Sequence, residues 1–204
     1  MEKRAYKSPL REEQARQTRD RILDAALSLF SSQGYGATSI ASIAREAGVV
    51  PETIYAGLGS KRGIIDALIE RAAPPRVVGA IDGQWSAKAD DPAAQLAALA
   101  HFTTAFWVRN AELAAVFRQG TGDAEIGEEW AIRQSVRYGL ALELLGSWPA
   151  STFRDGVTTV EATDILWALA SDEVFHLFVR DRGWTEERFE GWLVRVLCQE
   201  LLPA

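Results

Sequence analysis

The sequence predicts an all-α protein, and three observations support this. Apolar residues recur at helical spacing through most of the 204 residues, for example at Ile22, Ala25, Ala26, Leu29 and Phe30. The alternating β-branched runs that mark strands are essentially missing. Hydrophobic residues make up 48% of the chain, which is enough to form a sizeable core. We therefore expect a chain of helices joined by turns and loops.

Four helices are expected before Pro74-Pro75, at about 20–33, 40–47, 51–58 and 61–73. Ser8-Pro9 offers the first helix an earlier start, because serine caps helices and proline suits the first helical position. Either Thr38 or Ser39 can cap the second helix, and Gly48 ends it. These four short helices predict a small head.

The helices beyond the prolines are expected to be longer, at about 92–107, 111–119, 125–145, 158–170, 172–182 and 186–200. Asp91, Ser171 and Thr185 stand where N-caps belong. We expect one domain over residues 1–66, a three-helix helix-turn-helix head, and a second over residues 67–204, a helical body.

Charge is distributed unevenly along the chain. Residues 1–71 carry 11 Lys/Arg and 9 Asp/Glu, a net charge of +2, whereas the remainder carries 11 and 19, a net charge of −8. A basic head on an acidic body suits a protein that docks one end on a polyanion, although chance scatter gives the same pattern. The single cysteine, Cys198, excludes an internal disulfide and is expected to be a core or interface thiol. With no signal peptide and no membrane span expected, a cytoplasmic location is predicted.

Residues 38–58 read TSIASIAREAGVVPETIYAGL, which is two short helices joined by a tight turn at Gly48. A helix-turn-helix needs this arrangement, with the second helix presenting its N-terminal residues outward. Thr53 and Tyr55 supply hydroxyl groups for phosphates or base edges, and Lys61-Arg62 begin the next helix. The alternative is an ordinary three-helix cluster that has no DNA role.

Residues 20–70, and above all RILDAALSLFSSQGYGATSIASIAREAGVVPETIYAGLGSKRGIIDAL, resemble the DNA-binding head of the tetracycline-repressor (TetR) family. The stretch DILWALASDEVFHLFVRDRGWTEERFEGWL also resembles the tail of some members. The resemblance implies a homodimeric transcription regulator, more often a repressor. It would bind a palindromic operator in double-stranded DNA and be released by a small-molecule effector, with no cofactor and no membrane partner.

The resemblance also implies roles for single residues. Thr38, Tyr55 and Lys61 would hold phosphates, and the residues facing the major groove would be Pro51, Glu52, Thr53 and Ala56. Lys3, Arg4 and Lys7 would form a basic arm. Two departures matter: Val50 stands where a Ser or Thr cap is common, and Gly57-Leu58 replace a pair that is often aromatic or histidine.

In the body, the candidate ligand-binding residues are Phe102, Phe106, Trp107, Trp130, Arg133, Arg137 and Trp167. Each aromatic is more often a core residue than a pocket residue, and the two arginines suit either an acidic ligand or a solvated face and an ion pair with Glu129. The family resemblance implies a dimer interface through Leu166, Phe189, Leu193, Val196 and Leu197, for which an internal core is the alternative. Two distant histidines and one cysteine predict no metal site.

Two other classes of function remain open. We expect no enzyme, because the sequence shows no nucleophile–base constellation, metal spacing or phosphate loop. The alternative to a regulator is a helical small-molecule-binding protein, or an enzyme, whose head does not bind DNA. If the chain is a regulator, the fourth helix, residues 61–73, is expected to carry any signal between the body and the head.

Overall fold

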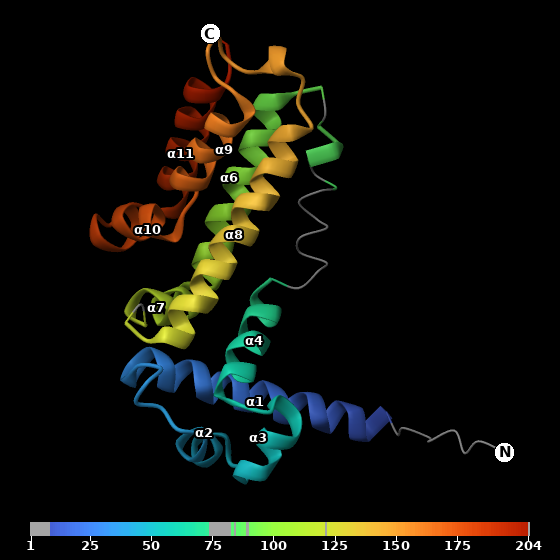
Figure 1. The fold of residues 1–204 in the computed structure, drawn as a ribbon, viewed down its shortest axis with the longest axis vertical. Helices are drawn as coiled ribbons and strands as arrows, with labels where there is room; N and C mark the ends of the chain where they lie inside the picture. Colours follow the sequence, from blue (N-terminus) through green and yellow to red (C-terminus); the bar gives the residue numbers. More distant parts are fainter. Residues whose placement is uncertain (1–8, 74–82, 84, 89, 121, 204) are drawn as a thin grey trace, which may run out of the picture. The chain divides into compact units, whose positions relative to one another are not determined.

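The computed structural model describes residues 9–73, 83, 85–88, 90–120 and 122–203. Over these residues the chain is helical and has no strand, as predicted (Figure 1). Its helices are α1 (Pro9–Gln33), α2 (Ile40–Ala47), α3 (Pro51–Leu58), α4 (Lys61–Ala72), α6 (Pro92–Arg109), α7 (Ala111–Gln119), α8 (Ala124–Gly146), α9 (Thr159–Leu169), α10 (Asp172–Phe175) and α11 (Glu186–Leu201). None of the described helices is both long and apolar enough to cross a membrane.

Most helix ends are set by the residues that the sequence indicates. The early start at Pro9 is used, which makes α1 a helix of 25 residues. Of the two candidate caps of α2, Ser39 makes the cap, in a reciprocal capping box with Ser42. Ser171 and Thr185 cap α10 and α11 with their hydroxyl groups.

Two segments differ from the predicted helices. The stretch between the predicted helices 125–145 and 158–170 contains a short 3₁₀ turn at Ala150–Thr152. The predicted helix 172–182 is α-helical only over α10 and continues as a π-helical turn, His176–Asp181, in which the Arg182 N–H reaches back five residues to the Leu177 carbonyl at 3.1 Å. A run this short cannot separate the two periodicities, and π turns are rare, so the pattern favoured an ordinary helix.

Contacts along the chain divide it into two compact units. Unit 1 consists of residues 1–72 and 115–127, and unit 2 of residues 73–114 and 128–204. This division places the boundary after Ala72 rather than at residue 66, because α4 is one continuous helix whose Ile65 and Leu68 are buried. It also adds a segment from the middle of the chain to the first unit.

Unit 1 is built around α1. Helices α2 and α4 pack on α1, and α3 packs on α2 and α4. The core of these four helices includes Ile22, Leu23, Ala26, Phe30, Ile43, Ala44, Ile54, Ile64, Ile65 and Leu68. The apolar positions that predicted the helices are therefore the ones that hold them together.

Residues 115–127 belong to unit 1 with their own buried side chains. Val116, Phe117 and Ile126 are each less than 5% exposed. A Cβ at Gly120 would lie 2.6 Å from Cγ2 of Ile126, so the close approach of these two residues requires glycine. The start of α8 is thus packed as tightly as the head helices are.

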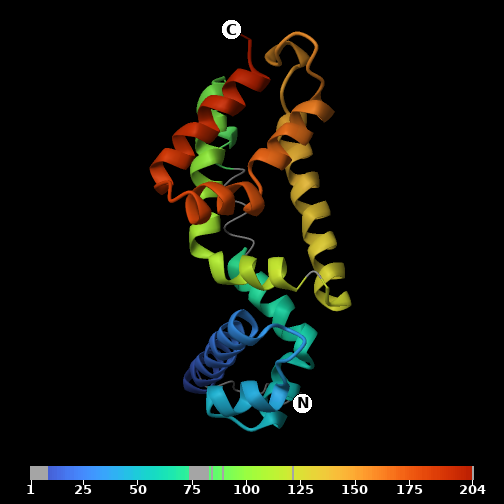
Figure 2. The same cartoon turned by 90° about the vertical axis from the view of Figure 1, so that its left-hand side faces the viewer.

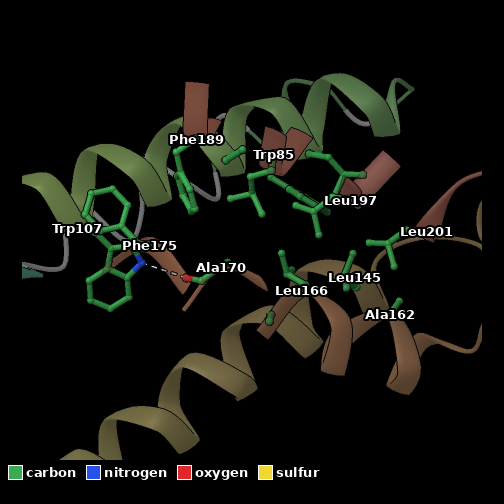
Figure 3. Packing of buried hydrophobic residues seen from close by; sticks show 14 of the residues in the cluster. Trp85, Trp107, Leu145, Ala162, Leu166, Ala170, Phe175, Phe189, Leu197 and Leu201 are labelled. Carbon is green, nitrogen blue, oxygen red and sulfur yellow. Dashed lines mark hydrogen bonds between the residues drawn. The ribbon is translucent and has the colours of Figure 1, made fainter. Parts of the chain in front are cut away.

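Unit 2 has a core formed by α6, α8, α9 and α11, in which α11 lies along α6 and also contacts α9 (Figure 2). Figure 3 shows the buried side chains, and the Trp107 indole nitrogen donates a hydrogen bond to the Ala170 carbonyl oxygen at 3.0 Å. Trp85 stacks on Trp148 with ring centroids 5.4 Å apart. Gln95 joins these two residues, because its amide nitrogen donates to the Trp85 carbonyl and its amide oxygen accepts from Trp148.

The side chains predicted for a dimer interface lie mainly in this core. Phe189, Leu193 and Leu197 are 0% exposed and Leu166 is 2% exposed within a single chain, whereas Val196 is partly exposed. The apolar stripe of α11 faces α6 and α9 of its own chain. Within one chain these four residues pack in the internal core, the alternative that the sequence left open, and their place in a dimer interface remains a prediction.

Candidate nucleic-acid interface

Helices α2 and α3 form a helix-turn-helix around Gly48. Gly48 has φ 66°, in the left-handed region, and its N–H bonds back to the Ala44 and Arg45 carbonyls. The Val49 N–H also bonds to the Ala44 carbonyl, at 2.9 Å. Because Ile43, Ala44 and Ala47 are buried beneath the turn, α2 is fixed and in turn fixes the start of α3.

Helix α3 is anchored by one residue and exposes most of the others. Ile54 is 0% exposed and holds the helix to the core of the head. Glu52, Tyr55 and Ala56 are exposed, and Pro51 and Thr53 are half-buried. The residues expected to face the major groove therefore lie on accessible or partly accessible positions of one short helix.

Both departures that the sequence showed are visible in α3. Val50 occupies the N-cap with an extended backbone, and its side chain makes no capping hydrogen bond. Gly57 is exposed, and a Cβ built on it would meet nothing within 4 Å. Glycine is therefore not required at this position by the packing of the head.

Thr38 is not the exposed hydroxyl group that the resemblance implied. The residue is 2% exposed, and its hydroxyl donates toward the carbonyls of Gly34, at 2.8 Å, and Leu29, at 3.3 Å. A buried hydroxyl that is used in this way stabilises the turn after α1. The Thr38 hydroxyl is thus used inside the head, and its expected contact with a phosphate remains a prediction.

The Lys61 side chain is likewise bonded to other residues of the head. Its ammonium group donates to the Tyr35 carbonyl at 2.9 Å and to the Thr38 carbonyl at 3.3 Å. The same group lies 4.0 Å from the centroid of the Tyr35 ring, a cation–π contact. Lys61 joins the start of α4 to the α1–α2 turn in the free chain, and its expected phosphate contact remains a prediction.

Several other cations of the head are paired with acidic residues. Arg16 pairs with Glu13, Arg19 with Glu70 and Arg71 with Asp24. Arg45 lies exposed on α2 of the helix-turn-helix, and the sequence analysis did not single it out. The proposed basic arm of Lys3, Arg4 and Lys7 lies outside the described residues.

Tyr35 is a second residue of the head that the sequence did not single out. The structure buries its ring and bonds its hydroxyl group to Glu125. The signal in the sequence was a large aromatic residue in a turn, where an exposed side chain is usual.

Two of the candidate ligand residues in unit 2 are brought together by α8 and α9. The Arg137 guanidinium lies 4.9 Å from the Trp167 ring centroid, and its Nη1 donates to the Trp167 carbonyl at 2.6 Å. Burial lowers the pKa of Arg137 to about 10, against the opposing effects of Glu173 and Asp172. Among the described residues, Trp167 Nε1 is the buried side-chain polar atom without a hydrogen-bond partner.

The other five candidates are arranged differently. Arg133 pairs with Glu129 at 2.7 Å, the alternative that the sequence left open. Trp107 is 8% exposed and hydrogen-bonded within the core. Phe102 and Phe106 stack on one face of α6 with centroids 6.0 Å apart, and Trp130 is half-buried on α8.

Comparison with known proteins gives a family match for the head. Residues 22–68 match the model of the bacterial regulatory proteins of the tetR family. The match covers this segment of the chain and no more. The HTH-type transcriptional regulator YvkB of Bacillus subtilis is 41% identical over 56 residues, which is 28% of this chain and 30% of that protein. The sequence match to YvkB thus spans less than a third of its length.

Solved structures extend the likeness to the fold of nearly the whole chain. NalD, the secondary repressor of the MexAB-OprM multidrug efflux pump in Pseudomonas aeruginosa, superposes with a TM-score of 0.76 at 22% identity, over 93% of this chain and 98% of NalD. SmeT in complex with triclosan superposes with a TM-score of 0.70 at 17% identity, over 91% of both chains. These likenesses establish the fold of nearly the whole chain.

Proposed function

We propose that this chain is a tetR-like DNA-binding transcription regulator, a repressor, that binds a palindromic operator in double-stranded DNA in the bacterial cytoplasm. The observation that carries the proposal is α3. Ile54 anchors the helix, while Glu52, Tyr55 and Ala56 are left exposed after a glycine turn. A helix that is anchored to the core on one face and exposed to solvent on the other suits insertion into the major groove.

Base readout is assigned to the start of α3. The Glu52 carboxylate can accept a hydrogen bond from a cytosine amino group. The Thr53 hydroxyl can donate a hydrogen bond to a base edge or accept one from it, and the Ala56 methyl can contact a thymine methyl. Pro51 sets the start of the helix, and Tyr55, which is 55% exposed, offers a hydroxyl group to a phosphate. Arg45 on α2 is a further candidate for the electrostatic role assigned to Lys61.

The regulator is proposed to be a homodimer, with a contact surface on α8 and α9. Four of the exposed large apolar side chains lie on α8, namely Ile132, Val136, Leu140 and Leu142, and Val160 lies at the start of α9. Ile132, Val136 and Leu140 are four residues apart, so they share one face. Gly139 on the same helix is open to solvent, which allows another helix to approach closely.

The pairing of α8 with α9 makes this face continuous. Tyr138 donates to Asp164 at 3.1 Å, and Arg137 donates to the Trp167 carbonyl, so the two helices run antiparallel. Two such helix pairs, one from each copy, would bury these side chains in a four-helix contact.

A small-molecule effector is proposed to bind in unit 2 beside Arg137 and Trp167. A buried N–H without a partner is costly, and an acceptor atom of a ligand would satisfy the Trp167 indole. That SmeT is solved with triclosan supports a small organic effector. A screen of melting temperature against metabolites should find it. Trp167→Phe, which removes the indole N–H together with its five-membered ring, should reduce the shift, whereas Trp130→Phe, the same change on α8, should not.

The proposal is tested by selecting duplexes from a random pool with the full-length chain and measuring binding by gel shift. We expect one two-fold symmetric sequence to be enriched. Glu52→Ala should alter base preference, whereas Glu46→Ala, an exposed acidic residue on α2, should leave it unchanged. The alternative is a small-molecule-binding protein whose head does not bind DNA, and the uncapped Val50 and Gly57 favour it. This alternative predicts that the selection enriches no duplex sequence.

A further inference from the structure

Tyr35, in the turn between α1 and α2, is bonded on three sides inside unit 1. Its hydroxyl donates to Glu125 Oε2 at 2.5 Å, its ring lies 5.1 Å from the Phe30 ring, and Lys61 Nζ sits 4.0 Å from its centroid. The ring is 3% exposed. Burial, followed by the hydrogen bond to Glu125, raises the pKa of the phenol, so it remains a donor at neutral pH.

The Tyr35 backbone sets the start of both helices that flank α3. Its carbonyl accepts the Thr38 N–H at 3.2 Å, one residue before the Ser39 cap of α2. The same carbonyl accepts the Lys61 ammonium at 2.9 Å, at the first residue of α4. A displacement of Tyr35 would therefore shift the starts of α2 and α4 together.

Glu125, the partner of the phenol, belongs to the first turn of α8. That helix starts in unit 1 and continues without a break through Arg137 in unit 2. The proposed effector residue and the partner of Tyr35 thus lie on the same helix.

We propose that Tyr35 is a positioning residue that couples α8 to the helix-turn-helix through its hydrogen bond to Glu125. The proposal rests on the proposed function, and it adds a second route to the one expected through α4. When α8 rotates or shifts, Glu125 moves the Tyr35 ring. The Tyr35 carbonyl then carries the movement to Thr38 and Lys61, and so to the two ends of α3.

Linkage makes the proposal testable without a known effector. Coupling is reciprocal. If a change in the conformation of α8 alters the affinity for DNA, then DNA binding must alter the conformational stability of α8 by the same free energy. The measurement is hydrogen–deuterium exchange of α8 amides in the full-length chain, with and without saturating duplex selected by the wild-type protein. The ratio of the two exchange rates reports the coupling.

The variants isolate one hydrogen bond. Tyr35→Phe removes the hydroxyl and keeps the ring contacts with Phe30 and Lys61, and Glu125→Gln weakens the acceptor from the other side. Tyr138→Phe is the matched control, because it removes a phenol that also donates to a carboxylate from α8, but within unit 2. A purely structural Tyr35 would lower stability without changing the exchange ratio.

We expect DNA to slow exchange in α8 of the wild type and of Tyr138→Phe by about fivefold or more. In Tyr35→Phe and in Glu125→Gln the ratio of exchange rates should fall toward one while DNA binding persists. The double variant should show the same ratio as either single variant. A wild-type ratio retained in both variants overturns the coupling. If the wild type binds no duplex, the proposed function fails first and the inference fails with it, which distinguishes the two.

Discussion

Gly57 and Gly63 both lie inside short helices of the head, yet a methyl group would meet different surroundings at each. A Cβ at Gly63 would lie 1.9 Å from the Leu58 carbonyl oxygen, whereas a Cβ at Gly57 has open space. Gly57→Ala should therefore stabilise the chain by about 0.5–1 kcal/mol, because alanine is the better helix former. Gly63→Ala should destabilise it by about 1–3 kcal/mol, because backbone must move.

Urea denaturation of the two glycine variants tests this contrast directly. The free energies of unfolding should change in opposite directions, although the chemical change is the same. If both variants gained stability, the close approach between Gly63 and Leu58 would be wrong.

A second prediction concerns the uncapped start of α3. Val50→Thr keeps the side-chain shape and adds a hydroxyl that can accept a backbone N–H, since Val50 already has the extended N-cap backbone. The free energy of unfolding should rise by about 1 kcal/mol. Val49→Thr, one residue earlier, is the control and should give no gain. Equal effects at the two positions would argue against a vacant cap at Val50.

At this scale the sequence indicated residue types well but not their partners. Ser39 and Thr38 were equal candidates for one cap, and only the fold shows that Thr38 points inward to two carbonyls. Lys61 was assigned to phosphates, because nothing local reveals that the Tyr35 carbonyl lies within its reach. Both contacts join residues that are remote in the sequence or depend on the turn between helices.

At the scale of helices, Lys61 holds α4 to the α1–α2 turn. Lys61→Met keeps the length of the side chain but removes the ammonium, and with it two hydrogen bonds and the cation–π contact. Because the group is partly exposed, we expect a loss of about 1–2 kcal/mol of stability. Arg45→Met is the matched control on exposed α2 and should leave the free energy of unfolding nearly unchanged, while weakening DNA binding at all sequences alike.

The outcome for Lys61 separates its two assigned roles. If Lys61→Met weakened DNA binding and flattened its salt dependence while leaving stability intact, the phosphate role would be supported. Thermal denaturation together with a salt titration of DNA affinity gives both quantities on the same preparations.

Helix positions were predictable to within a few residues because periodicity, caps and glycines agreed along the chain. Gly48, Ser171 and Thr185 end or begin helices in the structure as they do in the pattern. The π turn at His176–Asp181 was not predictable, because one extra residue in a single turn leaves too short a pattern.

At the scale of the whole molecule, the sequence predicted the amphipathic stripe of α11, and within one chain this stripe packs on α6 and α9. A buried face has the same periodicity whether its own chain or a second copy covers it. The structure places Leu193 at 0% exposure inside unit 2, whereas Val136 on α8 is 49% exposed. The inclusion of residues 115–127 in unit 1 could not be predicted from the sequence either, because it depends on contacts between segments that are remote in the sequence.

Two glutamate substitutions separate the core from the proposed dimer surface. Leu193→Glu buries a charge in the core and should cost more than about 4 kcal/mol, so the chain should lose its fold. Val136→Glu should leave the helical content and the melting of the monomer intact but break the dimer. Circular dichroism and sedimentation velocity measure the two properties. A folded dimer after Val136→Glu would exclude the α8 surface.

The central claim is that α3 of a symmetric dimer reads DNA, and the duplexes that the full-length chain selects from a random pool test it most directly. We predict enrichment of one sequence with two-fold symmetry and half-sites about 10 base pairs apart or a multiple of that spacing. Glu52→Ala and Thr53→Ala should each change the preferred bases within the half-sites. A pool that keeps its input composition after selection with the folded chain would contradict the account.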